Sequence, residues 1–158
     1  MMNFGFAGSG PKSGGGTAIL CDPNQVPASL AKVITDSGGT IIKGADPVAL
    51  PRAIKNATEI EGARSAQLRD GVAVTRFLCW LDGEPIGSKN EIDAARKLEA
   101  IRAETAIKMG SELLEISFDT ISGAGPNGAI VHYRVTEGTN RRLEDGTLYL
   151  NDSGAQYA

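Results

Sequence analysis

Apolar residues recur with two different periods along this chain, and the change of period divides the sequence into a helical part and a strand-rich part. Between residues 57 and 109 they recur every three or four positions, which predicts two long amphipathic helices. From residue 117 onward the period becomes that of strands, with turn-forming residues between the strand-like segments. Helices followed by strands favour an α+β fold, in which two long helices lie against an antiparallel sheet.

Capping signals indicate where the two helices begin and end. Asn56 is followed three residues later by Glu59, which is the pattern of a capping box, and Gly83 ends the first helical stretch. The second helix is predicted to begin at a similar box that starts at Ser88 and to continue to about Met109.

Three segments in the second half of the chain have the composition of strands. They are residues 118–121, 129–136 and 147–151. The segments between them are rich in turn-forming residues, at 122–128 and 137–146.

The N-terminal part of the chain has a different character. Residues 1–16 contain six glycines, so we expect a flexible tail. A short strand, a helix and a second strand are predicted to follow, at residues 17–21, 27–37 and 40–43. Because so small a unit cannot form a domain by itself, we interpret residues 17–46 as the end of a preceding α/β domain and residues 47–158 as part of the next domain.

Charge and composition exclude several classes of partner. The 16 Lys and Arg residues are balanced by 19 Asp and Glu residues, and no cationic run that could bind a nucleic-acid backbone is present. No apolar run approaches the roughly 20 residues that span a bilayer, and residues 1–16 lack the features of a signal peptide. Cys21 and Cys79 have no metal-ligand spacing, so reduced thiols are expected. We therefore expect a cytoplasmic protein without nucleic-acid or membrane partners.

His132 is the single histidine among the 158 residues and therefore a candidate catalytic residue. Alternation along the predicted strand 129–136 places His132 on the face opposite Val131 and Tyr133. The residue type leaves two interpretations open: a half-buried structural histidine, or a neutral imidazole near a reaction centre.

Asp152 follows the last predicted strand and precedes Ser153 and Gly154. Such a residue can be part of a turn, or it can be a carboxylate at a strand end that binds a hard metal ion or acts as a general base. Ser153 would need His132 and a third, orienting acid to act as a serine-protease nucleophile. Asn151 stands where that motif has glycine, which argues against this alternative.

Six segments, in order and spacing, resemble the Xaa-Pro aminopeptidases (aminopeptidase P) of the creatinase and methionine-aminopeptidase group. These segments are Ala53–Asn56 with Glu59 and Gly62, Arg69–Gly71, Phe77–Leu81, Phe118–Gly123, Gly125–Arg134 and Asp152–Tyr157. The resemblance implies the pita-bread fold of that family, with the first half of its catalytic domain in residues 47–158.

The resemblance also implies a reaction and two site residues. Enzymes of this family release the N-terminal residue of a peptide whose second residue is proline, by attack of a hydroxide held between two divalent metal ions, usually Mn²⁺. By the resemblance, Asp152 corresponds to the first of five metal ligands, which are two Asp, one His and two Glu. His132 corresponds to an active-site histidine that contacts the substrate without binding metal. A homodimer is one arrangement open to the parent protein.

The departures from the family pattern limit these implications. The other four ligands would follow Tyr157, beyond the end of this sequence, so we expect a fragment that is inactive by itself. Asn151 stands where the family usually has an apolar residue. Two alternatives stay open, namely a non-catalytic pita-bread module that binds peptides or acts as a scaffold, and a creatinase-like hydrolase.

Overall fold

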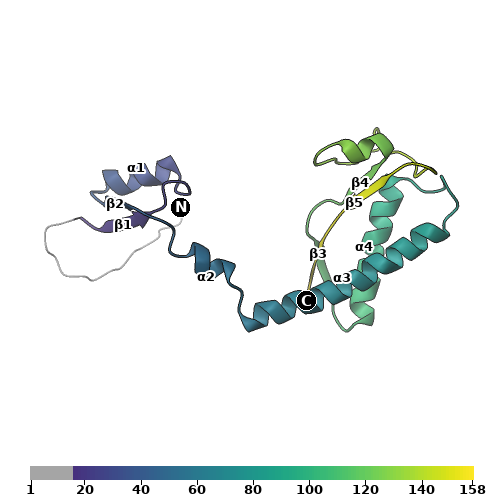
Figure 1. The fold of residues 1–158 in the computed structure, drawn as a ribbon, viewed down its shortest axis with the longest axis horizontal. Helices are drawn as coiled ribbons and strands as arrows, with labels where there is room; N and C mark the ends of the chain where they lie inside the picture. Colours follow the sequence, from purple (N-terminus) through teal and green to yellow (C-terminus); the bar gives the residue numbers. More distant parts are fainter. Residues whose placement is uncertain (1–15) are drawn as a thin grey trace. The chain divides into compact units, whose positions relative to one another are not determined.

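The computed structural model describes residues 16–158, so almost all of the predicted flexible tail lies outside the described part of the chain. Contacts between residues divide the chain into two compact units, Met1–Lys55 and Asn56–Ala158 (Figure 1). Within the described residues, no helix combines the length and the apolarity needed to cross a lipid bilayer.

The first unit contains a parallel pair of strands connected by a helix. Strand β1 (Ala18–Cys21) pairs with strand β2 (Thr40–Lys43), and helix α1 (Ala28–Asp36) connects them. The predicted strand, helix and strand are confirmed to within one residue at each end. A short helix, α2 (Ala49–Ala53), follows.

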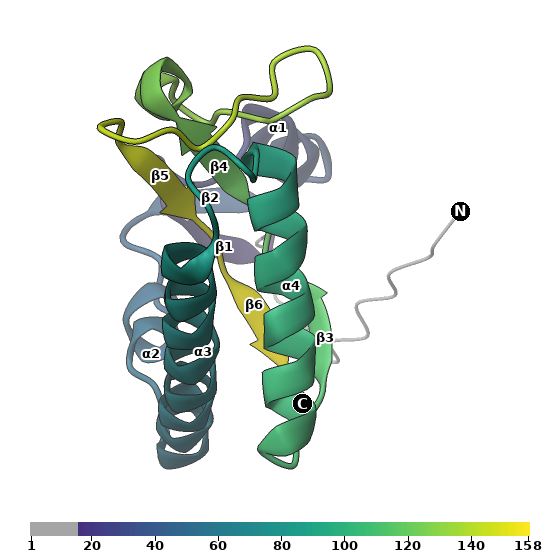
Figure 2. The same cartoon turned by 90° about the vertical axis from the view of Figure 1, so that its right-hand side faces the viewer.

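Two long helices, α3 (Ala57–Gly83) and α4 (Glu91–Lys108), lie side by side in the second unit (Figure 2). The buried apolar residues between them are Ala73, Phe77, Ala94, Leu98 and Ile101. Ala73 and Ala94 are both 0% exposed, and their small side chains let the helices approach closely. Both predicted helices are confirmed, and the burial of their apolar stripes holds them together.

The capping box predicted for α3 is confirmed, whereas the one predicted for α4 is wrong. The Asn56 side chain accepts a hydrogen bond from the Glu59 amide at 2.9 Å, and the Asn56 amide donates to the Glu59 carboxylate at 2.8 Å. The N-cap of helix α4 is instead Asn90, whose side chain accepts from the amide of Asp93 at 2.9 Å. Ser88 has no capping role because the carboxylate it would pair with, that of Glu91, is buried against other segments.

Replacing Asn90 with alanine is expected to lower the free energy of unfolding by about 1 kcal/mol, because the Asp93 amide in the first turn of α4 loses its capping acceptor. Urea unfolding of the purified chain, followed by circular dichroism, measures this loss. Ser88→Ala is the matched control and should leave the unfolding midpoint unchanged. An equal loss of unfolding free energy in the two variants would show that Ser88 also caps the helix.

The strands of the second unit form two antiparallel pairs. Strand β3 (Leu113–Ile116) pairs with β6 (Ala155–Tyr157), and β4 (Ile121–Ala124) pairs with β5 (Tyr149–Asp152). The last predicted strand is confirmed as β5 with a shift of its bounds. The strand predicted at 118–121 is wrong in its placement, because β4 begins only at Ile121.

The strand predicted at residues 129–136 is wrong. A short 3₁₀ helix, η1 (Gly125–Ala129), is followed by a turn in which the Tyr133 amide donates to the Ile130 carbonyl at 3.2 Å. His132 has a φ angle of +53°, which no strand residue adopts. The β-branched and aromatic residues of this segment have strand propensity, and tertiary contacts override that propensity.

Candidate functional site

A fully buried carboxylate holds the loop that contains His132. Glu91, the first residue of α4, is 0% exposed. Its carboxylate accepts hydrogen bonds from the Ala124 amide at 2.6 Å, the Asn127 side chain at 2.9 Å, the Tyr133 hydroxyl at 2.9 Å and the Arg141 amide at 3.0 Å. Several donors are needed because a buried charge without them is costly. We call these five residues the Glu91 cluster.

The environment of the Glu91 cluster keeps its tyrosine protonated. Burial raises the pKa of Tyr133, and the hydrogen bond to the Glu91 carboxylate raises it further. Burial likewise raises the pKa of Tyr149, whose ring packs against the helix core. Tyr133 therefore remains a hydrogen-bond donor to Glu91 at neutral pH.

His132 lies directly before Tyr133, on the exposed side of the same loop. The first interpretation, a half-buried histidine on a strand, is wrong, because the residue is exposed and its backbone is left-handed. A residue other than glycine adopts this conformation at a cost of about 1–2 kcal/mol. The hydrogen bonds of Asn127 and Tyr133 on either side of this position provide the contacts that oppose this strain.

A second hydrogen-bonded group, which we call the Arg102 cluster, consists of the buried Arg102 and the partly buried residues Asp70, Ser153 and Tyr157. Arg102 is 1% exposed and donates to both carboxylate oxygens of Asp70, from Nε at 2.8 Å and from Nη2 at 3.2 Å. Its Nη2 also donates to the Ser153 hydroxyl at 3.2 Å. The Tyr157 hydroxyl donates to Asp70 at 2.7 Å, and burial together with this bond raises the pKa of Tyr157 to about 12.

Asp152 lies at the end of β5, where it is paired with Ile121 of β4. Tyr149 of the same strand packs against the helix core, and alternation along a strand sends Asp152 to the opposite face. Asp152 is accordingly exposed, whereas Asn151 is partly buried and donates from its side chain to the Tyr149 hydroxyl at 3.1 Å. The polar side chain of Asn151 is thus accommodated by a hydrogen bond.

The two predicted site residues belong to different structural groups. His132 is held through the Glu91 cluster, and Asp152 is adjacent to the Arg102 cluster. The Ser153 hydroxyl donates to Asn151 at 2.9 Å and accepts from Arg102, and none of the hydrogen bonds among residues 16–158 joins it to His132. These contacts give no support to the serine-protease alternative.

Asp152 has the donor type that a hard divalent cation requires. An exposed carboxylate at a strand end can bind such an ion through one or both oxygens. Within the described part of the chain, no group of three or more His, Cys, Asp or Glu side chains could hold a metal ion. The chemistry of Asp152 therefore fits one ligand of a metal site rather than a whole site.

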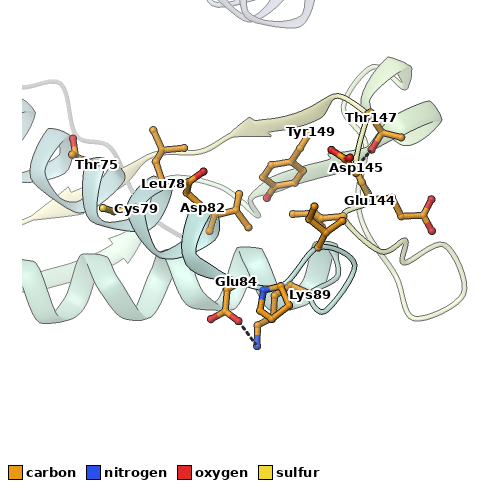
Figure 3. Close-up of a pocket in the computed structure, with 15 residues that line it drawn as sticks. Thr75, Leu78, Cys79, Asp82, Glu84, Lys89, Glu144, Asp145, Thr147 and Tyr149 are labelled. Carbon is orange, nitrogen blue, oxygen red and sulfur yellow. Dashed lines mark hydrogen bonds and ion pairs between the residues drawn. The ribbon is translucent and has the colours of Figure 1, made fainter.

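An open pocket of about 890 Å³ lies at the C-terminal end of α3 (Figure 3). Its walls are the end of α3, the loop that leads to α4, residues 143–147 and Tyr149. Lys89 in this loop pairs with Glu84, with 3.3 Å between Nζ and Oε2. Neither His132 nor Asp152 lines the pocket, so it is separate from both predicted site residues.

Sequence reasoning missed the helix residues that position the two loops. Glu91 and Arg102 are both on α4 and both lie outside the segments that carry the family resemblance. Their spacing contained a signal, because Glu91 precedes the core residue Leu98 by seven positions and Arg102 follows it by four. A charged residue on the apolar stripe of a helix indicates a buried polar contact.

Comparison with known sequences gives one family. The sequence profile of metallopeptidase family M24 matches residues 61–158. A curated protein named probable Xaa-Pro aminopeptidase P, from Penicillium rubens, is 43% identical over 122 residues, which cover 75% of this chain and 19% of that protein. A protein of the same name from Coccidioides posadasii is 45% identical over 114 residues, which cover 70% of this chain and 17% of that protein. The chain thus spans about a fifth of the length of these relatives.

Solved structures of proteins named X-prolyl or X-Pro aminopeptidase resemble the fold of this chain. The crystal structure of an X-prolyl aminopeptidase from Caenorhabditis elegans, described as a cytosolic enzyme with a di-nuclear active site, aligns with a TM-score of 0.65 at 33% identity. The alignment covers 80% of this chain and 20% of that enzyme. An X-Pro aminopeptidase from Thermotoga maritima aligns with a TM-score of 0.63 at 22% identity, over 89% of this chain and 36% of that one. These structures confirm the predicted α+β fold.

Proposed function

Because the chain belongs to metallopeptidase family M24, we propose that it forms part of the catalytic domain of an Xaa-Pro aminopeptidase. Such an enzyme removes the N-terminal residue from a peptide whose second residue is proline. The observation that carries this proposal is the 43% identity to a protein named probable Xaa-Pro aminopeptidase P. We assign residues 47–158 to the first half of the catalytic domain and residues 17–46 to the end of the preceding domain.

Asp152 is proposed to supply one carboxylate ligand to a site for two divalent metal ions, with Mn²⁺ as the usual ion. Its exposure at the end of β5 and its hard oxygen donors support this role. When bound, the two ions would lower the pKa of a water molecule and stabilise negative charge on the carbonyl oxygen that is attacked. In this proposal, the fold of this chain fixes the orientation of the Asp152 carboxylate.

His132 is proposed to contact the substrate. Its exposure lets the imidazole reach a peptide, and the neutral ring can donate one hydrogen bond and accept another. The Glu91 cluster fixes the neighbouring residue Tyr133, so the position of the His132 backbone is set before the substrate arrives. A prearranged contact of this kind orients the peptide at little cost in entropy.

The proposed enzyme acts in the cytoplasm on free peptides. The net charge of −3 and the absence of a cationic run support a role without nucleic acid. The related enzyme from Caenorhabditis elegans is described as cytosolic, which supports the proposed location.

The direct test uses the full-length protein that contains this segment, purified and supplied with Mn²⁺. We expect it to release the first residue of an Xaa-Pro tripeptide in a metal-dependent reaction. A matched tripeptide with alanine at the second position should be cleaved at least about tenfold more slowly, since one specific pocket contact changes a rate by roughly this factor. Metal binding and peptide binding without cleavage would contradict the proposal and favour a scaffold module.

The 158-residue chain by itself is expected to show no cleavage above the rate without protein, because the single carboxylate of Asp152 cannot hold two metal ions. The assay is the same tripeptide incubation with added Mn²⁺. Turnover that chelator abolishes would show that a complete metal site exists in these residues, contrary to this expectation.

A further inference from the structure

The segment that follows Asp152 contacts an ion pair between the two long helices, in which Arg102 is buried and Asp70 is partly exposed. Figure 2 shows β5 passing into β6 beside α3 and α4, and the turn between the two strands is residues 153–154. Asp70 projects from α3 and Arg102 from α4, and their bidentate contact joins the two helices. Arg102 also donates to Ser153 in this turn, and Asp70 accepts from Tyr157 at the end of β6.

The first anchor is immediately next to the proposed metal ligand. Arg102 Nη2 donates to the hydroxyl of Ser153, the residue that follows Asp152, at 3.2 Å. The second anchor is the bond from the Tyr157 hydroxyl to Asp70, at 2.7 Å. The backbone between these anchors is further held at Gly154, whose carbonyl accepts from the Ser117 amide at 2.9 Å. The segment that follows Asp152 is therefore anchored to the helix pair, while Asp152 itself pairs with Ile121 of β4.

We infer that Asp70 and Arg102 are positioning residues that set the metal affinity of Asp152. This inference rests on the proposed function, because it assigns Asp152 to a metal site. Neither residue touches the metal or the substrate in this inference. They act through Ser153 and Tyr157, which they hold by hydrogen bonds.

A role in stability alone does not account for the pair. Arg102 is 1% exposed, and its Nη1 has no hydrogen-bond partner among the residues that the structure describes. A buried guanidinium with an unpaired donor is costly to desolvate, and apolar residues of similar size often stabilise a fold equally well. Apolar residues cannot orient hydrogen-bonding groups. The planar guanidinium can, because it fixes the positions of several acceptors at once.

The matched control is on the same pair of helices. Arg76 of α3 pairs with Glu104 of α4 at 3.0 Å, and its side chain is partly exposed. Arg76 makes no hydrogen bond to residues 152–157 within the described chain. Arg76→Lys and Arg102→Lys thus make the same chemical change in two interhelical ion pairs, of which only one touches the turn.

The experiment measures the dissociation constant of Mn²⁺ by titration calorimetry on the metal-free full-length protein. Partners that orient a metal ligand typically change affinity by about 10- to 100-fold, so we expect Arg102→Lys to raise this constant by that factor. Arg76→Lys should leave it within about twofold of the unmodified protein. At saturating Mn²⁺, the kcat of Arg102→Lys should recover toward the unmodified value, which a general loss of folded protein would not produce.

Ser153→Ala keeps the inference testable if Arg102→Lys fails to fold, because it removes only the hydroxyl and leaves the Asp70–Arg102 pair intact. A several-fold rise in the Mn²⁺ dissociation constant is expected for this variant. Unchanged Mn²⁺ affinity in the folded variants would overturn the inference. Mn²⁺ binding by the unmodified protein without cleavage of Xaa-Pro peptides would refute the proposed function alone, since the affinities of the variants would still decide the positioning role.

Discussion

Replacement of Glu91 with alanine is expected to lower the free energy of unfolding by more than about 3 kcal/mol, because four donors lose the buried carboxylate that accepts their hydrogen bonds. Two of these donors are backbone amides, at Ala124 and Arg141, and two are the side chains of Asn127 and Tyr133. Each buried donor without a partner costs about 1–3 kcal/mol, and the segments that contain them can rearrange only in part.

Urea unfolding of the purified chain measures this loss. Glu99→Ala is the matched control, since Glu99 is an exposed glutamate on the same helix, and it should change the free energy by less than about 0.5 kcal/mol. Glu91→Gln should fall between the two, because the amide keeps one acceptor oxygen but has no charge. Equal stability of Glu91→Ala and Glu99→Ala would show that the Glu91 cluster does not hold the fold together.

Replacement of Asp152 with asparagine is expected to have the opposite profile, a large loss of activity with little loss of stability. In the full-length protein, kcat/KM for an Xaa-Pro peptide should fall by about 1000-fold or more, because a metal ion contributes several kcal/mol to the barrier and each 1.4 kcal/mol is a factor of ten. The melting temperature should stay close to that of the unmodified protein, since Asp152 is exposed at the end of β5.

Metal content after dialysis, together with the rate of peptide cleavage, provides the measurement for Asp152. Asp145→Asn is the control, because Asp145 is an exposed aspartate in the loop before β5. An Asp152→Asn protein that retains two metal ions and full activity would remove Asp152 from the ligand set. The two predictions together separate the residue that holds the fold from the residue proposed to hold the metal.

Features that depend on neighbouring residues could be predicted from the sequence. The start of α3 at Asn56 and its end at Gly83 depend on contacts within a few residues, and both were predicted correctly. The strand, helix and strand of the first unit follow from local periodicity in the same way. The start of α4 was misplaced by two residues, because Ser88 and Asn90 both fit a capping pattern and only the burial of Glu91 decides between them.

Features that depend on distant residues could not be predicted in this way. The segment around His132 has the composition of a strand, yet its conformation is determined by the bond between Tyr133 and Glu91, which are 42 positions apart. Strands β3 and β6 are four and three residues long and pair although they are far apart in the sequence, so neither has a strong local signal. Short segments of this kind become strands only when a partner is present.

The sequence by itself determined the α+β class, the two long helices and the identity of the two candidate site residues, because these follow from local periodicity and from ordered family motifs. Only the tertiary structure decided that His132 lies on an exposed left-handed turn and that Ser153, the residue after Asp152, accepts a hydrogen bond from Arg102 of the Asp70–Arg102 pair. The physical reason is burial. Glu91 and Arg102 are charged residues enclosed by the fold, so each must find its hydrogen-bond partners in whichever distant segments lie beside it.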